Sequence, residues 1–137
     1  MSRHVVAEIA DLPPGGRKVV TVKGREIVIF NVGGNLSALL NKCPHEGAQL
    51  CYGVQTGLFE SDDPGTYSYS RPKEFIRCPW HGWEFDLATG KSYCAPDSVW
   101  VRQYPVTVVE GERLAEGPFS VETFEVSVEG RYVVVDL

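Results

Sequence analysis

Two short motifs, Cys43-Pro44-His45 and Cys78-Pro79-Trp80-His81, each pair a cysteine with a histidine. Together they offer two thiolates and two imidazoles to a metal. This donor set suits tetrahedral zinc, suits a mononuclear iron or copper centre less well, and suits a [2Fe–2S] cluster in which two histidines replace two cysteines on one iron. Proline fixes its own φ, so a motif that contains one follows a rigid path. Such rigidity favours a metal site that keeps its shape when its charge changes.

The order of these motifs resembles that of the Rieske proteins. The shared pattern is Cys-x-His followed, further along the chain, by Cys-x-x-His-Gly-Trp. Residues 78–90 look like the second cluster loop of ring-hydroxylating oxygenase systems, and Ala95-Pro96 is similar to the proline-bearing third loop of the family. The stretch between the two motifs, residues 46–77, is longer than is usual for the family. A surface insertion there costs little if its ends stay close together.

The resemblance implies one [2Fe–2S] cluster per chain, with two cysteines on one iron and two histidines on the other: Cys43 and Cys78, and His45 and His81. The histidines are expected to lie close to solvent, where they give the electron a short path to a docked partner. The resemblance also implies a supporting shell of prolines, glycines and tryptophans: Pro44, Gly47, Pro79, Trp80, Gly82, Trp83 and Pro96.

Four positions separate this sequence from the high-potential respiratory branch of that family. The branch has a disulfide between the positions that match Ala48 and Trp80, and neither is cysteine here. It also has hydroxyl donors at the positions that match Trp83 and Phe85, and both hydroxyls are missing here. Fewer donors stabilise the reduced, more negative cluster less. We therefore predict a potential at the low end of the Rieske range of about −150 to +300 mV.

The elements that must position these motifs are predicted to be short strands. Nine prolines and 14 glycines mark frequent turns, and the intervening runs are rich in β-branched residues, which favours strands over helices. Residues 53–73 are polar and are expected to form an exposed loop. The last two strands below alternate well and are predicted to form a hairpin. The predicted strands are Val5–Ile9, Lys18–Val22, Glu26–Val32, Leu36–Asn41, Phe75–Arg77, Trp83–Phe85, a run over Val99–Val109, Phe124–Val128 and Tyr132–Val135.

We therefore predict an all-β fold: one Rieske-like domain over residues 1–137, built from antiparallel sheets. A smaller cluster-binding subdomain, at about residues 42–97, is inserted between strands of this base. An apolar fraction of 43% is enough to build a core for one compact domain.

Composition excludes several kinds of partner. The net charge of −5 opposes nucleic-acid binding, which needs a concentrated basic surface. No run approaches the roughly 18–20 apolar residues that cross a bilayer, so we expect no membrane association and a cytoplasmic protein. In a reducing compartment, four cysteines favour metal ligation or buried thiols. We expect Cys51 and Cys94 to be buried, apolar thiols and His4 to be solvated.

The predicted function is electron transfer rather than catalysis. After the four ligands only His4 remains, so the chain cannot build a 2-His-1-carboxylate iron site or a Ser-His-Asp triad. The resemblance implies a low-potential ferredoxin component that carries single electrons from a flavoprotein reductase to a terminal oxygenase. One alternative is a subunit similar to the small Rieske-like subunit of nitrite reductase. The other is a structural or regulatory module that binds zinc.

Overall fold

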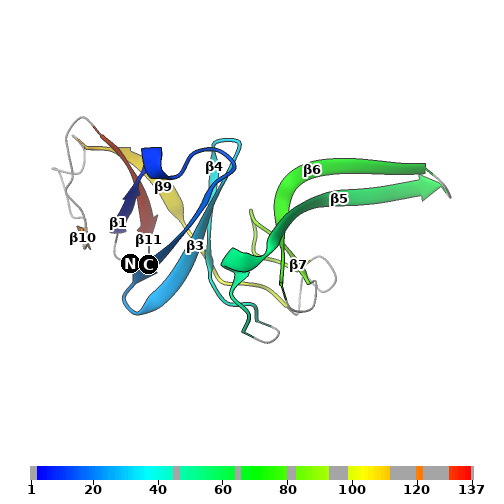
Figure 1. The fold of residues 1–137 in the computed structure, drawn as a ribbon, viewed down its shortest axis with the longest axis horizontal. Helices are drawn as coiled ribbons and strands as arrows, with labels where there is room; N and C mark the ends of the chain where they lie inside the picture. The colour runs from blue at the N-terminus through cyan, green and yellow to red at the C-terminus, as the bar shows by residue number, and fades with distance from the viewer. Residues whose placement is uncertain are drawn as a thin grey trace. The chain divides into compact units, whose positions relative to one another are not determined.

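The computed structural model describes residues 3–44, 47–63, 66–79, 83–92, 99–111, 120–121 and 130–136. It divides into two compact units. The first consists of Met1–Leu40 together with Gln103–Leu137, and the second of Asn41–Arg102. Figure 1 shows the strands of both units.

Two four-stranded sheets build the first unit. Neighbouring strands are antiparallel except β1 and β10, which are parallel. One sheet has the order β10 (Ser120–Val121), β1 (Arg3–Glu8), β11 (Arg131–Asp136), β9 (Val106–Glu110). The other has the order β2 (Arg17–Val22), β3 (Arg25–Val32), β4 (Asn35–Leu40), β8 (Gln103–Tyr104). A short 3-10 helix, η1 (Ile9–Asp11), follows β1.

Two tight turns set the register of β2, β3 and β4. Lys23 and Gly24 join β2 to β3 with φ of 51° and 77°, and Gly33 and Gly34 join β3 to β4 with φ of 60° and 98°. Positive φ at both central residues is the requirement of a two-residue hairpin whose twist matches its strands. The sequence-based prediction of these three strands is confirmed, with ends shifted by one residue.

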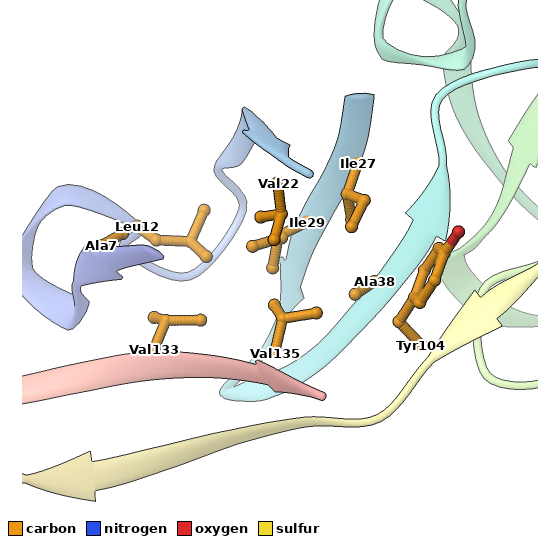
Figure 2. Close-up of a cluster of buried hydrophobic side chains, with 9 residues drawn as sticks. All are labelled: Ala7, Leu12, Val22, Ile27, Ile29, Ala38, Tyr104, Val133 and Val135. Atoms are coloured by element: carbon orange, nitrogen blue, oxygen red, sulfur yellow. The ribbon is translucent and has the colours of Figure 1, made fainter. Parts of the chain in front are cut away.

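The main core of the first unit lies between its two sheets. Figure 2 shows nine buried side chains, of which eight come from strands of the two sheets and Leu12 from the segment after η1. Residues 27–30 of β3 are fully buried on both faces of the sheet, which matches their uninterrupted apolar run. The core side chains are Ala7, Leu12, Val22, Ile27, Ile29, Ala38, Tyr104, Val133 and Val135.

His4 lies in β1 and is only 3% exposed, so the prediction that it is solvated is wrong. The reason is that β1 is an inner strand, paired with β10 on one side and β11 on the other. Proximity to the chain end therefore does not expose this side chain.

The predictions for the C-terminal third need two corrections. The run over Val99–Val109 is divided: β8 and β9 lie in different sheets, on either side of Pro105. Proline has no N–H for a sheet ladder, so it marks the change of sheet. The predicted hairpin between Phe124–Val128 and Tyr132–Val135 is also wrong, because β11 pairs with β1 on one side and β9 on the other. Residues 124–128 themselves lie outside the described residues.

The second unit contains a three-stranded antiparallel sheet of order β5, β6, β7. Its strands are β5 (Val54–Asp63), β6 (Thr66–Arg77) and β7 (Glu84–Asp86), and a 3-10 helix, η2 (Leu50–Tyr52), precedes β5. Leu50, Ile76 and Phe85 are fully buried in this unit.

The prediction of an exposed loop over residues 53–73 is wrong, because β5 and β6 form a long hairpin there (Figure 1). Residues 66–70, Thr-Tyr-Ser-Tyr-Ser, alternate residue types with period two and are rich in strand formers. The prediction of a loop relied on the polar composition of this stretch and overlooked the alternation. A bulge also interrupts it: Thr56 pairs with Phe75 and Leu58 with Ser70, so residues 71–74 lie opposite a single residue.

The bulge accommodates two residues that do not fit the hydrogen bonding or the backbone conformation of a regular strand. Pro72 cannot donate to a ladder, and Lys73 has a positive φ of 64°. The Gln55 side chain stabilises the bulge by donating from Nε2 to the carbonyl oxygen of Lys73 over 3.0 Å.

Candidate metal centre

Cys43 begins a closed loop in the second unit. It follows β4 after Asn41 and Lys42 and is fully buried. Its backbone N–H donates to the carbonyl oxygen of Ala48 over 2.8 Å, and its own carbonyl accepts from the N–H of Gly47 over 2.8 Å. Gly47 has a φ of 82°, which is the left-handed conformation that glycine adopts most easily. The sharp turn that closes this loop is therefore made at Gly47, whose place in the supporting shell stays a prediction.

Cys78 begins a second loop closed in the same way. It follows β6 and is 3% exposed. Its N–H donates to the carbonyl oxygen of Trp83 over 2.7 Å, and β7 starts at the next residue. The span from 78 to 83 equals the span from 43 to 48. Each cysteine thus sits at the closed base of a loop of the same length, and the sequence places a histidine within each loop.

The structure describes half of the predicted ligand set. Cys43 and Cys78 both lie in the second unit, both are buried, and neither is joined in a disulfide. His45 and His81 lie outside the described residues, as do Trp80, Gly82 and Pro96 of the predicted shell. Within the described residues no group of three or more metal-binding side chains is found. The donors that the structure does place, two buried thiols, fit a cluster that is bound through thiolates.

The remaining shell residues differ in exposure. Pro44 and Pro79 are exposed and Trp83 is half-buried. Phe85, which stands where the respiratory branch has a hydroxyl, is fully buried in β7. A hollow beside the second loop is lined by Tyr52, Gly53, Val54, Arg77, Cys78 and Pro79.

A family model described as the Rieske [2Fe-2S] domain matches residues 2–105. This chain belongs to the Rieske family. Members of this family carry a [2Fe–2S] cluster, so the predicted cofactor is confirmed at the level of the family. The family assignment favours this cluster over zinc.

Relatives in this Rieske family include ferredoxins of two dioxygenase systems. The chain is 32% identical over 104 residues to the ferredoxin component of the naphthalene 1,2-dioxygenase system of Pseudomonas aeruginosa, covering 76% of this chain and 84% of the relative. It is 30% identical over 118 residues to the 3-phenylpropionate/cinnamic acid dioxygenase ferredoxin subunit of Escherichia coli K12, covering 86% and 96%.

Solved structures share the fold of this Rieske protein. The ferredoxin of carbazole 1,9a-dioxygenase from Nocardioides aromaticivorans IC177 gives a TM-score of 0.58 at 24% identity, with 97% of each chain covered. The Sphingomonas yanoikuyae B1 ferredoxin gives 0.62 at 22% identity, with 99% of each chain covered. The terminal oxygenase of the Nocardioides system gives 0.61 at 18% identity, covering 98% of this chain but 30% of the oxygenase. The prediction of an all-β Rieske-like fold is therefore confirmed.

Cys51 was predicted to be a buried thiol in apolar surroundings, and the structure differs. It is half-buried, and its Sγ lies 3.3 Å from Nδ2 of Asn41 and 3.8 Å from Oε1 of Gln49. Its surroundings are therefore polar. Cys94 lies outside the described residues.

The sequence-based prediction missed Asn41. This side chain is 5% exposed and forms two hydrogen bonds with Cys51, across the loop that begins at Cys43 (the first ligand loop, named for its predicted ligands). A polar residue directly after an apolar strand is the only sequence signal for it, and that signal does not distinguish a buried asparagine from a solvated one.

Shortening the β5–β6 hairpin should leave the metal centre unchanged. Residues 75–77 of β6 pair with β7 on one side and with residues 54–56 of β5 on the other, and they directly precede Cys78. Replacing residues 58–71 by a two-residue turn should therefore preserve the iron content and the EPR spectrum of the reduced protein within error. A loss of half or more of the iron would show that the outer hairpin contributes to the site. The control is a turn insertion at residues 23–24, in the first unit.

Proposed function

We propose that this protein is the ferredoxin component of a ring-hydroxylating oxygenase system, passing single electrons from a flavoprotein reductase to a terminal oxygenase. The observation that carries the proposal is the pair of buried thiols, Cys43 and Cys78, each at the base of a closed loop of equal length. The relatives described above, which are ferredoxin components of dioxygenase systems, support it.

The proposed ligands are Cys43 and Cys78 on one iron and His45 and His81 on the other. When bound, the cluster takes up and releases one electron. The chain itself contributes by holding the ligands in position. The hydrogen bonds from the Cys43 and Cys78 N–H groups to Ala48 and Trp83 hold both loops closed. Burial of the thiols keeps water from the sulfur ligands, which preserves the geometry when the charge of the cluster changes.

We further propose that residues 1–137 form one Rieske-like domain in which the second unit is the cluster-binding part. The reduction potential should lie in the lower part of the family range of about −150 to +300 mV, since Phe85 offers no hydroxyl at a fully buried position. No helix in the described part of the chain combines the length and apolar character needed to cross a membrane, and we propose a cytoplasmic location.

Purified protein should be red-brown, contain iron and sulfide in a 1:1 ratio, and contain no stoichiometric zinc. After reduction it should give a rhombic EPR signal with the low average g of mixed cysteine and histidine ligation, and direct voltammetry should return a potential below zero. Colourless protein with stoichiometric zinc and no EPR signal would overturn the proposal.

Electron transfer should then be measured with separate partners. The reductase of a naphthalene dioxygenase system, with NADH, should reduce the protein in a stopped-flow experiment, and the oxidised terminal oxygenase should reoxidise it. The control omits this protein and should show little transfer between the two enzymes. A reduced cluster that the oxygenase does not reoxidise would argue against a carrier role.

A further inference from the structure

The Asn41 side chain bridges the two ends of the first ligand loop. Its Oδ1 accepts a hydrogen bond from the backbone N–H of Cys51 over 2.7 Å, and its Nδ2 donates to the Sγ of Cys51 over 3.3 Å. The two residues are ten apart in sequence. The shorter closure, from Cys43 N–H to the Ala48 carbonyl, lies within this span. The loop is therefore closed twice, once by backbone and once by a side chain.

The contact also satisfies the start of η2. The first N–H groups of a helix have no partner within it, and the residue before η2, Gln49, makes no side-chain capping bond. Asn41 accepts from one of these N–H groups, at Cys51, although it is distant in sequence. Because Asn41 is 5% exposed, water cannot readily replace it. Cys51 itself is half-buried, and removing the partner of a partly buried donor lowers stability.

The residue after η2 packs against the end of β6, directly before Cys78. η2 ends at Tyr52 and is followed by Gly53, where a Cβ would overlap the carbonyl oxygen of Arg77 and lie 3.1 Å from that of Leu50. Arg77 directly precedes Cys78, and it pairs with Val54 in the sheet. A continuous path of packed backbone thus runs from the first loop, through η2, to the base of the second.

We propose that Asn41 is a positioning residue, which holds the Cys43 loop against η2 and so keeps it in register with the Cys78 loop. The inference rests on the proposed cluster ligands. Ala48, at the end of the first loop, is 1% exposed and offers no covalent link to the second loop. Asn41 and the close approach at Gly53 supply a non-covalent connection between the loops.

The test compares two buried asparagines in the intact, cluster-loaded chain. Asn41→Leu removes both hydrogen bonds at nearly constant size. Asn31→Leu is the matched control, because Asn31 is 3% exposed and also bonds at both ends, to the Leu12 carbonyl and the Gly34 N–H, but lies in the first unit. The readouts are the rate at which the visible colour bleaches in excess chelator, the EPR g values after reduction, and the midpoint of thermal unfolding.

Asn41→Leu should release its cluster about tenfold faster than the wild type, as expected for the loss of two partly buried hydrogen bonds, and should shift or broaden the EPR signal. Asn31→Leu should lower the unfolding midpoint but leave the bleaching rate and the g values unchanged. Cys51→Ala removes only the Sγ contact and keeps the backbone N–H, so its bleaching rate should lie between wild type and Asn41→Leu.

Equal bleaching rates for Asn41→Leu and wild type, with a lowered unfolding midpoint, would reduce Asn41 to a stabilising residue and overturn the inference. If Asn41→Leu protein does not accumulate, Asn41→Asp takes its place, because it keeps the oxygen acceptor and loses the Nδ2 donor. Faster bleaching of this variant supports the inference, and bleaching at the wild-type rate overturns it. A wild-type protein without the Rieske EPR signal would instead contradict the proposed function, so the two failures are distinguishable.

Discussion

Cys78→Ser protein should purify without colour, with its iron content lowered by more than about tenfold, and should give no EPR signal after reduction. The Cys78 thiol is 3% exposed at the base of a closed loop, and a serine hydroxyl there is a poor substitute for a thiolate. Even partners that only hold a metal ligand in place change metal affinity by roughly 10–100-fold, so the loss of a ligand itself should cost more. Iron analysis and the visible spectrum of the purified protein measure the effect.

Cys51→Ser is the matched control. It changes a thiol of the same unit that is half-buried and bonded to Asn41 rather than placed at the base of a ligand loop. It should retain at least roughly nine-tenths of the wild-type iron, since a hydroxyl can also accept from Nδ2 of Asn41. A full cluster in Cys78→Ser protein, or loss of the cluster in Cys51→Ser alone, would mean that the ligand assignment is wrong.

The sequence is most informative where local geometry and residue type agree. Gly24, Gly33 and Gly34 occupy turns that require positive φ, so the strands β2, β3 and β4 follow from turn chemistry and apolar runs alone. The cysteines at 43 and 78 are likewise found where their motifs predicted, in loops that follow strands. In both cases the decisive signal lies within a few residues.

Features that depend on distant partners were missed. The β5–β6 hairpin has a polar sequence, and the bulge at residues 71–74 breaks its alternation. The position of β11 between β1 and β9 depends on pairing across most of the chain, which a local pattern of alternation does not reveal. The buried state of His4 has the same origin.

Asn41 illustrates why a candidate site cannot be completed from sequence. Its type and position permit a solvated loop residue as readily as a buried bridge. What distinguishes them is the return of the chain at Cys51, which places an N–H and a sulfur within reach of one amide. Motif analysis identifies candidate metal ligands, but it does not identify a side chain that reaches their loop through a contact ten residues along the chain.

His81→Cys should lower the reduction potential by roughly 100–200 mV, because a charged thiolate replaces one of the two neutral imidazoles and adds negative charge at the cluster. The magnitude follows from the gap between Rieske centres, at about −150 to +300 mV, and plant-type ferredoxins with four cysteines, at about −400 mV. Direct voltammetry measures the shift. The average g of the reduced protein should rise at the same time toward that of an all-cysteine cluster, which gives an independent readout of ligation.

The matched control introduces the same thiol at the one histidine outside the motifs. His4→Cys lies in β1 of the first unit, in a different unit from Cys43 and Cys78, and should leave both the potential and the g values unchanged. If His81→Cys keeps the wild-type potential and spectrum, His81 is not a ligand. If it fails to retain a cluster while His4→Cys retains a full one, the loss arises at the motif and not from an added thiol, and the ligand role then rests on the potential and g values of the fraction that keeps a cluster.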